Sequence, residues 1–396
     1  MSIKKKLLFV NGHLHVGGGE KSLLDLLTWL DYSIYEVDLL LIEDEGEYLE
    51  LLPPQVNVYF VDTTKAYGSF LPTMLQAIKK GQFYAVWYRM VILLSSFFGK
   101  KWLLLTKLVF PISSHYDCAI SYRPGPCADI VAFAVKADKK ICWWHNGKCD
   151  YTPSQIKEVD CTWRYFDYVV SVSEGCKRMI TENFTYPIER IVVIPNIIDI
   201  DKIKKKAGND NPYNDDAIFR LITVCRLSKE KHLENAIYVM SKLNLEKRIG
   251  LKWYIVGEGP ERHYIEMLIQ QNNLQNNIIL LGQKINPYPY IKFADAFVST
   301  SYQESQGLTI LEAMALKVPC VVTETIGTKE YAIDKWNCLL AEPSCEALFE
   351  SVDEMISSLT KVGPFIGNAY ESVCSNYRRE IIIHKFQSLI NSLCQF

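Results

Sequence analysis

The sequence predicts an α/β fold made of two successive, doubly wound domains. Short apolar runs rich in Val, Ile, Leu and Phe alternate with longer amphipathic stretches, a pattern typical of βαβ units and parallel sheets. The alternation stops once, in a polar segment, and then restarts. The length of 396 residues also suits two domains, each large enough to bury a core of its own.

The apolar runs predict one sheet before the polar segment and a second sheet after it. In the first half, strands are expected at 6–10, 37–42, 56–61, 118–121, 140–144, 168–172 and 191–194, with a helix beginning near Glu20. In the second half, strands are expected at 219–225, 251–256, 278–281, 296–299 and 318–323, with helices at 233–243 and 261–271. Apolar residues at helical spacing in 380–393 predict an amphipathic terminal helix.

The segment 196–217 is expected to be a linker and surface loop, because it is polar and contains a lysine-rich stretch. Residues 1–195 would then form an N-terminal domain and residues 196–379 a C-terminal domain. The terminal helix, within 380–396, is expected to pack back on the first domain. Ligands of parallel sheets bind at the carboxyl ends of the strands, so the site is expected where the two domains face each other across a cleft.

Composition argues against several classes of protein. The formal net charge of −2 offers no basic surface of the kind that nucleic-acid-binding proteins carry. The 12 cysteines include no CxxC pair, which argues against a zinc framework or a redox motif and favours reduced thiols in the cytoplasm. The short apolar run after the first lysines predicts a strand rather than a signal peptide. The longest apolar region, 86–112, is interrupted by Arg89 and by Gly99-Lys100-Lys101, so no membrane-spanning helix is expected.

Two positions in the N-terminal domain are candidates for substrate contact. Gly17-Gly18-Gly19 follows the first strand and opens a helix, where backbone amides can approach an anion; a plain tight turn is the alternative. His145 follows strand 140–144 and can point into the cleft, where a histidine can hydrogen-bond a sugar hydroxyl. A capping or structural histidine is the alternative for His145.

Arg226 and Lys231 follow strand 219–225 and precede the next helix, so both can reach the turn between them. Arginine grips phosphate oxygens with its planar fork, and lysine adds a point charge. An exposed charged loop is the alternative, and the neighbouring Lys229 and Glu230 favour that alternative on composition alone.

Glu304 and Glu312 flank a turn and the start of an apolar helix. Carboxylates accept hydrogen bonds from sugar and ribose hydroxyls, and the amides of Gly307, Leu308 and Thr309 at the helix start are expected to face anionic phosphates. The alternative is an acidic helix start, which the helix dipole stabilises by only ~0.3–1 kcal/mol. Glu312 fits that alternative poorly, because it stands in an apolar stretch where an acid without a partner would be costly.

These segments occur in a specific order: Gly18-Gly19-Glu20, Ile194-Pro195-Asn196, Arg226 with Lys231, residues 256–261, Glu304, Glu312-Ala313-Met314-Ala315 and Pro319. In this order and spacing they resemble the retaining glycosyltransferases of family 4, which have the two-domain Rossmann-like architecture called GT-B. The resemblance covers almost the whole chain and is strongest from 191 to 330.

The resemblance implies retaining transfer of a sugar from a nucleotide-sugar, most often UDP-linked, with no metal required. Arg226 and Lys231 would bind the diphosphate, and Glu312 the ribose hydroxyls. Glu304 would lie near the anomeric centre of the donor sugar, and His145 would contact that sugar from the opposite domain. The turn at Gly18 and Gly19 would approach the phosphate and the acceptor. The backbone amides of residues 307–309, which follow Glu304, would contact the sugar and the phosphates.

The chain departs from the family pattern at three places. Ser305 and Gln306 precede Gly307, where the family loop is often glycine-rich. Ile197-Ile198 follows Asn196, where the family usually has a glycine. Asp199-Ile200-Asp201 looks like the metal-binding DxD of another glycosyltransferase fold, but it lies in the expected linker and is assigned no ligand role.

The acceptor, a saccharide or a lipid-linked molecule, is expected on the N-terminal domain. Residues 87–107 mix aromatic and basic side chains, a composition suited to an anionic membrane surface; buried helices packed on the first sheet are the alternative. The expectation is a hexosyltransferase, cytoplasmic and peripheral on the membrane, in bacterial surface polysaccharide or glycolipid synthesis. A sugar-nucleotide epimerase of the same layout and a non-catalytic nucleotide-sugar-binding scaffold are the alternatives.

Overall fold

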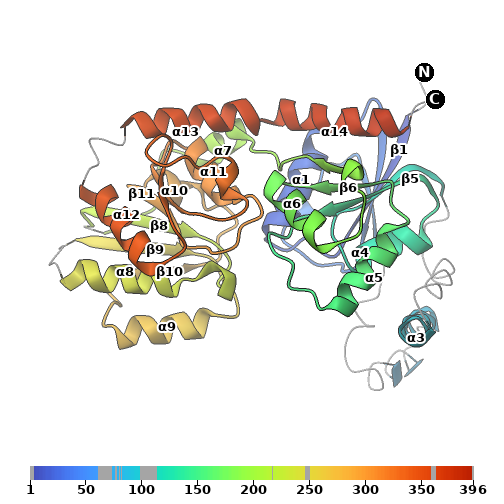
Figure 1. The fold of residues 1–396 in the computed structure, drawn as a ribbon, viewed down its shortest axis with the longest axis horizontal. Helices are drawn as coiled ribbons and strands as arrows, with labels where there is room; N and C mark the ends of the chain where they lie inside the picture. Colours follow the sequence, from blue (N-terminus) through green and yellow to red (C-terminus); the bar gives the residue numbers. More distant parts are fainter. Residues whose placement is uncertain are drawn as a thin grey trace.

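The computed structural model describes residues 4–60, 74–75, 78–79, 81, 83–98, 114–215, 217–245, 250–357 and 363–394. These residues form two parallel sheets that lie side by side, each covered by helices (Figure 1). The predicted α/β class, with two Rossmann-like domains of the GT-B type, is therefore confirmed.

The N-terminal sheet has seven parallel strands within the described residues, in the order β3-β2-β1-β4-β5-β6-β7. Its strands are β1 (Lys5–Asn11), β2 (Tyr35–Leu41), β3 (Val56–Phe60), β4 (Tyr116–Ser121), β5 (Ala137–Trp144), β6 (Tyr168–Ser171) and β7 (Ile191–Val193). Its helices are α1 (Gly18–Trp29), α3 (Phe83–Phe98), α4 (Pro126–Asp129), α5 (Pro153–Trp163) and α6 (Glu174–Asn183), with short helical turns at Leu49–Leu51, Ile130–Ala134 and Ile188–Arg190. Each predicted strand appears, although residue 61 of the expected strand 56–61 lies outside the described residues.

The C-terminal sheet has six parallel strands in the described part of the chain, in the order β10-β9-β8-β11-β12-β13. They are β8 (Phe219–Val224), β9 (Leu251–Val256), β10 (Ile278–Gly282), β11 (Ala296–Ser299), β12 (Cys320–Thr323) and β13 (Leu339–Ala341). The helices are α7 (Ile200–Ala207), α8 (Glu234–Leu245), α9 (Arg262–Gln271), α10 (Tyr288–Lys292), α11 (Leu308–Ala315), α12 (Cys345–Ser357), α13 (Gly363–Asn376) and α14 (Arg379–Leu393), with short turns at Lys229–Lys231 and Thr328–Glu330. The sequence did not predict β13, α12 or α13.

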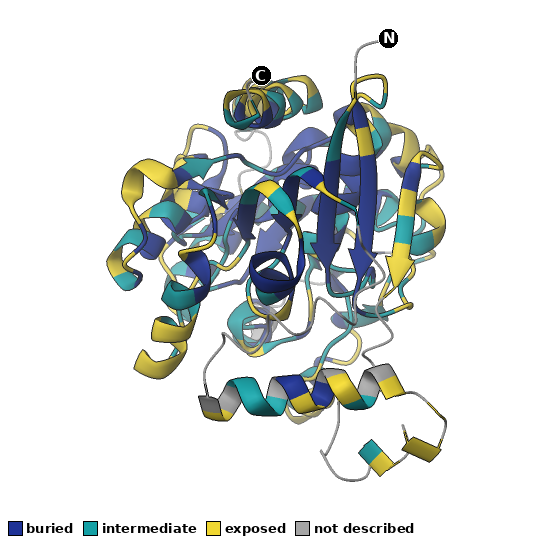
Figure 2. Ribbon diagram, turned by 90° about the vertical axis from the view of Figure 1, so that its right-hand side faces the viewer, coloured by how far each residue is buried: buried dark blue, intermediate teal, exposed yellow. Residues whose placement is uncertain are grey.

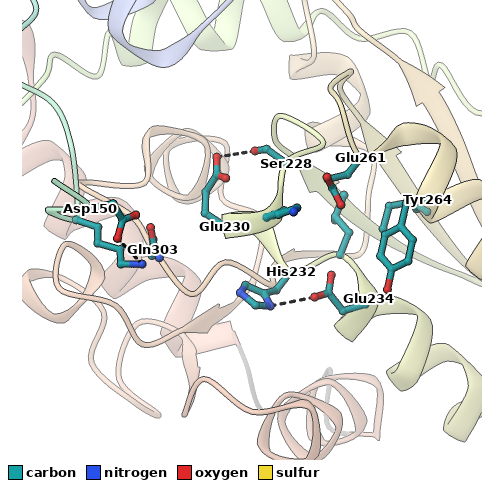
Figure 3. A pocket seen from close by; sticks show the side chains of 12 residues that line it. Asp150, Ser228, Glu230, His232, Glu234, Glu261, Tyr264 and Gln303 are labelled. Atoms are coloured by element: carbon teal, nitrogen blue, oxygen red, sulfur yellow. Dashed lines mark hydrogen bonds and ion pairs between the residues drawn. The ribbon is translucent and has the colours of Figure 1, made fainter. Parts of the chain in front are cut away.

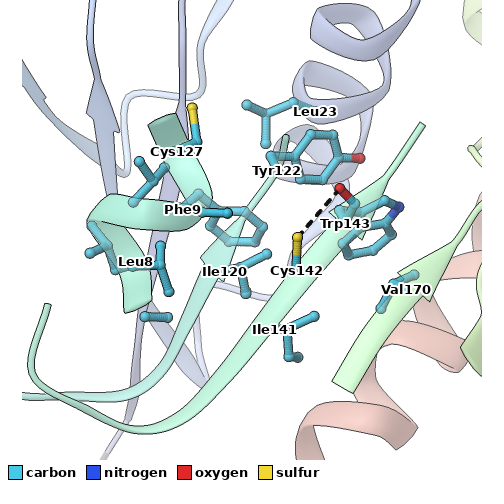
Figure 4. Close-up of a cluster of buried hydrophobic side chains, with 14 of the residues drawn as sticks. Leu8, Phe9, Leu23, Ile120, Tyr122, Cys127, Ile141, Cys142, Trp143 and Val170 are labelled. Atoms are coloured by element: carbon cyan, nitrogen blue, oxygen red, sulfur yellow. Dashed lines mark hydrogen bonds between the residues drawn. The ribbon is translucent and has the colours of Figure 1, made fainter. Parts of the chain in front are cut away.

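The central strands β1, β2 and β4 are largely buried on both faces, which explains why they are apolar runs. Leu7 to Val10 of β1 are fully buried, and Trp143 and Phe9 pack in the same cluster, shown in Figure 4. Phe386 of the terminal helix α14 stacks on both of these rings at 6.2 Å. Helix α14 therefore belongs to the core of the first domain, although it follows the second domain in sequence.

The segment expected to be a plain linker is partly helical, so the loop prediction for 196–217 is wrong for residues 200–207. Helix α7 begins after Asp199, whose side chain accepts a hydrogen bond from the amide of Lys202. Ile200 and Ile203 are buried against the C-terminal core, while Lys204, Lys205 and Lys206 are exposed. The high content of lysine hid an amphipathic helix, because its apolar positions, spaced by three and four residues, cover only about two turns.

Helices α13 and α14 run one after the other across the top of both domains (Figure 1). Helix α13 packs on α11 and buries Ala369 and Val373 in the C-terminal core. The polypeptide thus joins the domains twice, once before α7 and once between these two helices.

Helix α3 lies apart from the sheet, at the lower end of the N-terminal domain in Figures 1 and 2. It exposes Phe83, Trp87, Met90 and Phe97 on one stripe, with exposed fractions from 40% to 75%. Val91, which follows Met90 directly, is fully buried. The remainder of the expected aromatic and basic region, from residue 99 to 107, lies outside the described residues.

Candidate active site between the domains

The strand order of each sheet reverses once, between β1 and β4 in the first and between β8 and β11 in the second. At such a reversal the loops that follow the two strands diverge, which leaves room for a ligand at the carboxyl ends of the strands. The candidate residues lie on or beside these loops: Gly18 and Gly19 after β1, Arg226 and Lys231 after β8, and Glu304 after β11.

Two helix N-termini face each other across the domains. Helix α1 is preceded by Gly17, and α11 by Gly307, and neither N-cap residue supplies a side chain to the unpaired amides. A Cβ added to Gly18 would lie 3.7 Å from the side chain of Leu308, so the two helix starts are close neighbours. Their free amides and dipoles make the space between them suited to an anion.

Gly307 has a φ of 76°, a backbone conformation that favours glycine, and this turn directs the chain into α11. Leu308 and Thr309 form the first turn of that helix and are partly buried, so their amides lie at the helix start as the sequence predicts. Gly19 lies against the guanidinium of Arg123, which forms an ion pair with the buried carboxylate of Glu20.

Lys231 and Glu304, predicted from separate motifs, are direct partners. Lys231 Nζ donates to Glu304 Oε1 at 2.7 Å, and both side chains are mostly buried. Burial opposes the charge of Lys231, but Glu304, together with Cys225 and Glu230, outweighs this effect and raises the pKa of Lys231 above its ordinary value. Arg226 lies on the same loop but is exposed, and its side chain forms no ion pair or hydrogen bond with the described residues.

The loop that follows His145 reaches Glu304 from the opposite domain. Two residues later, a Cβ added to Gly147 would lie only 2.7 Å from the backbone of Glu304, so the loops are in contact. The ring of His145 stacks with Trp143, with ring centroids 6.4 Å apart, and lies tilted against Tyr122 at 4.9 Å. Its Nε2 atom is buried without a hydrogen-bond partner among the described residues. Burial lowers the pKa of His145 to about 3, and the charge of Arg123 acts in the same direction. The ring is therefore neutral at physiological pH, and one of its nitrogen atoms is available to a ligand.

Glu312 has surroundings that the sequence did not predict. It is buried in α11, and its Oε1 atom accepts a hydrogen bond from the hydroxyl of Tyr288 at 3.2 Å and lies 3.1 Å from Nζ of Lys21. Burial raises the pKa of the Glu312 carboxyl, while the charge of Lys21 works against that rise. Lys21 comes from α1 of the other domain, so this pair crosses the cleft.

Gln306, a departure from the family pattern, has a clear structural role. It is 2% exposed, and its Oε1 atom accepts hydrogen bonds from both the backbone and the side-chain amide of Asn196, at 2.8 and 2.7 Å. Ser22 of α1 donates to the Oδ1 atom of the same Asn196 at 2.5 Å. Gln306 therefore ties the loop before α11 to the chain segment that joins the domains.

The carboxylates of Asp199-Ile200-Asp201 are engaged in the structure by protein groups. Asp199 caps α7 and accepts a hydrogen bond from the indole of Trp29 at 2.8 Å. Arg379 of α14 lies 3.3 Å from Asp199 and 3.2 Å from Asp201. Among the described residues, no group of three or more potential metal ligands comes together.

A cavity of about 750 Å³ opens beside the Lys231–Glu304 pair (Figure 3). Several of its lining residues adjoin that pair in sequence, namely Glu230, His232 and Gln303, and Lys148 follows Gly147. It is lined from both domains by polar and apolar side chains, among them the carboxylates of Asp150, Glu234 and Glu261 and the ring of Tyr264. Lining of this kind offers hydrogen bonds to a hydroxyl-rich ligand.

Sequence reasoning missed Lys21, Tyr288 and Asn196 as parts of the site. Lys21 directly follows the glycine turn and Glu20, and this position on the first turns of α1 was the one available signal that it belongs to the site. Tyr288 begins a short helix between Pro287 and Pro289 and offered no such signal.

Comparison with known proteins agrees with this geometry. Residues 201–371 match the family described as glycosyl transferases group 1, which covers most of the C-terminal domain. A poly(ribitol-phosphate) alpha-N-acetylglucosaminyltransferase of Staphylococcus aureus is 27% identical over 57% of this chain and 44% of its own length. The N-acetylgalactosamine-N,N'-diacetylbacillosaminyl-diphospho-undecaprenol 4-alpha-N-acetylgalactosaminyltransferase of Campylobacter jejuni is 27% identical over 48% of this chain and 51% of its own length. The chain spans about half the length of the curated relatives it matches.

Solved structures match the chain over both domains. HepE of Anabaena, in complex with UDP-glucose, superimposes with a TM-score of 0.73 at 17% identity, covering 98% of this chain and 99% of that one. A glycosyltransferase of Rickettsia africae gives a TM-score of 0.72 at 17% identity and covers 99% of each chain. At this level of identity the likeness establishes the shared fold.

Proposed function

The chain is related to the glycosyl transferases of group 1, and on this premise we propose that it transfers a sugar from a UDP-sugar to a saccharide or lipid-linked acceptor with retention of anomeric configuration. The observation that carries the proposal is the pair of helix N-termini facing each other, with Lys231 and Glu304 beside them. The helix N-termini and Lys231 can balance the negative charge of a diphosphate, and Glu304 can accept hydrogen bonds from sugar hydroxyls in the same cleft.

The proposed donor lies between the two domains. Its diphosphate is held by the amides of the two helix starts and by Lys231 and Arg226, and Glu312 accepts hydrogen bonds from the ribose. The sugar lies between Glu304 and His145, whose neutral ring and free nitrogen suit a hydrogen bond with a sugar hydroxyl. The UDP and UDP-glucose complexes of HepE support a uridine nucleotide as the first candidate.

In the proposed reaction an acceptor hydroxyl attacks the anomeric carbon on the face from which UDP leaves. The bond between that carbon and the β-phosphate oxygen breaks, a new carbon–oxygen bond forms, and the acceptor proton passes to the departing phosphate. The negative charge that develops on the diphosphate is stabilised by Lys231, Arg226 and the helix amides, so these groups supply the counter-charge without a metal. No side chain acts as a covalent nucleophile in this scheme.

For the acceptor, we propose a lipid-linked or surface saccharide whose carrier lies at a membrane. The exposed stripe of α3, formed by Phe83, Trp87, Met90 and Phe97, is an apolar helix face of the kind that inserts into the membrane interface. None of the described helices has the length and apolar character needed to cross a bilayer. The cavity beside Glu304, with its carboxylates, supports a saccharide as the part of the acceptor that reaches the site.

Sedimentation with lipid vesicles tests the membrane contact. The double variant Phe83→Ser/Phe97→Ser is expected to lose binding to phosphatidylcholine vesicles that contain phosphatidylglycerol, whereas Ile188→Ser, which removes an exposed apolar side chain elsewhere in the domain, should retain it. Equal sedimentation of all three proteins, or no sedimentation of the parent, would refute the membrane proposal while leaving the transferase proposal standing.

A thermal-shift screen of nucleoside diphosphates and nucleotide-sugars tests the donor site, because a ligand that binds the native state raises its melting temperature. We expect selective stabilisation by UDP and one UDP-sugar, followed by release of UDP when the correct acceptor is added. Isomerised free nucleotide-sugar without acceptor would instead indicate an epimerase. Binding without release of nucleotide across an acceptor panel would indicate a non-catalytic scaffold.

A further inference from the structure

A cluster of charged side chains joins the two domains beside the candidate nucleotide site. Lys21 of α1 lies between two carboxylates, with its Nζ atom 2.6 Å from Asp25 Oδ2 and 3.1 Å from Glu312 Oε1. The side chains of Asp25 and Glu312 are only 2% and 3% exposed. Lys202 of α7 donates to the other oxygen of Asp25 at 2.8 Å, so each carboxylate of the cluster has a cationic partner.

We infer that Lys21 is a positioning residue for the nucleotide, which holds Glu312 as an oriented carboxylate from the opposite domain. The inference rests on the proposed function, in which Glu312 accepts hydrogen bonds from the ribose. Lys21 and Tyr288 both contact the Oε1 atom of Glu312, and within the described residues no hydrogen bond occupies Oε2. Two fixed contacts on one oxygen leave the other oxygen directed and available to the ribose.

The charge of Lys21 matters because Glu312 is buried. Burial raises the pKa of Glu312, and Lys21 is the cation that opposes this rise. The other titratable groups that face Glu312 are Asp25 on α1, Tyr288 on α10 and Tyr48 before the turn at Leu49–Leu51. A protonated carboxyl has lost a charged acceptor, so it binds ribose hydroxyls less strongly than the carboxylate does.

Lys21 is itself fixed and kept charged. Burial alone would lower its pKa, but Asp25, Tyr288 and Glu312 hold the pKa of Lys21 well above its ordinary value. Because Lys21 and Glu312 belong to different domains, their contact requires α1 and α11 to be together. The ribose site is therefore complete only when the domains are closed, and separation of the domains leaves Glu312 without its counter-charge.

Calorimetric titration with UDP, GDP and ADP tests this inference on the full chain. For the best-binding diphosphate, Lys21→Met is expected to weaken affinity about tenfold, and Lys21→Arg to restore most of it. As the pH is lowered, the nucleotide affinity of Lys21→Met should begin to fall at a higher pH than that of the parent. The reason is that Glu312 protonates more readily without the charge of Lys21. Comparison with the parent at each pH cancels the ionisation of the nucleotide itself.

Lys202→Met is the matched control, because it removes a cation from Asp25 without touching Glu312, and its affinity should stay near that of the parent. In a Glu312→Gln background, Lys21→Met should add little, since its target is already neutral. Parental affinity and pH profile in Lys21→Met, or the same tenfold loss in both backgrounds, would overturn the positioning role. A parent protein that binds none of the diphosphates would instead refute the proposed donor site, and with it this inference.

Discussion

The two carboxylates of the site, Glu304 and Glu312, lie eight positions apart in sequence but in contrasting surroundings. Glu304 is 15% exposed and pairs with Lys231 of its own domain. Glu312 is 3% exposed and pairs with Lys21 of the other domain. The Lys231–Glu304 pair can therefore form within the C-terminal domain alone, whereas the Lys21–Glu312 pair needs both domains. This difference suggests that turnover and nucleotide affinity depend on different parts of the cleft.

The largest effect is expected at Glu304, which the proposal places at the reacting sugar. Glu304→Ala should lower turnover by about 10²–10³-fold, the usual range for loss of one group that stabilises a transition state. Its nucleotide affinity should change far less, because the diphosphate and ribose contacts remain. Steady-state kinetics and calorimetry on the same protein measure both quantities. Glu324→Ala, which removes a surface carboxylate paired with Lys329, is the control.

Equal losses of turnover and nucleotide affinity in Glu304→Ala would contradict the proposed difference between Glu304 and Glu312. Such a result would place Glu304 in nucleotide binding along with Glu312.

At Glu312 we expect the opposite pattern. Glu312→Ala should weaken nucleotide binding by about 10–100-fold, since it removes a charged acceptor of hydrogen bonds worth about 1.5–3 kcal/mol. Turnover at saturating donor should fall less than in Glu304→Ala. Calorimetric titration with UDP measures the affinity, and Glu312→Gln separates the loss of charge from the loss of the side chain. An unchanged dissociation constant in both variants would refute the ribose assignment.

The contrast also shows what the sequence could predict. Both carboxylates, Lys231 and the glycine turns come after strand ends, so alternation of apolar runs was enough to place them at the carboxyl edges of the two parallel sheets. The two sheets and nearly all of their strands were predicted for the same reason, because buried parallel strands are continuous apolar segments.

The parts that were missed depend on contacts between distant segments. Lys21 and Glu312 are almost 300 positions apart, and no local pattern shows that α1 will lie against α11. Gln306 looked like a departure from a glycine-rich loop until its bonds to Asn196 were seen. Helix α7 was taken for a loop because its lysines outweigh its few apolar positions.

Gln306 lies between the two carboxylates and tests whether the segment that joins the domains holds them in place. Gln306→Ala leaves the buried amide groups of Asn196 without their acceptor, which should lower the free energy of unfolding by about 1–2 kcal/mol. Urea unfolding followed by tryptophan fluorescence measures the loss. Gln303→Ala, in the same loop but facing the cavity, should cost much less. Equal stability of the two variants would mean that the bonds to Asn196 contribute nothing net.

The smallest effect is expected from His145, which faces the Glu304 region across the cleft. Its pKa is about 3 in the folded protein and about 6.5 when unfolded, so between these values the unfolded state binds more protons. The stability that depends on the neutral ring is complete above pH 6.5 and is lost as the pH falls toward 3. Because the ring is partly exposed, we expect a loss of only about 1 kcal/mol between pH 7 and pH 5.

Urea midpoints of the parent and of His145→Asn at the two pH values measure this effect. The variant should lose less stability than the parent on acidification, and His115→Asn, at an exposed position paired with Asp138, should behave as the parent does. If His145→Asn and the parent lose equal stability, the imidazole is protonated without cost. His145 would then carry a positive charge in the cleft and contact the donor sugar as a cation. The proposal instead places a neutral His145 against this sugar, opposite Glu304.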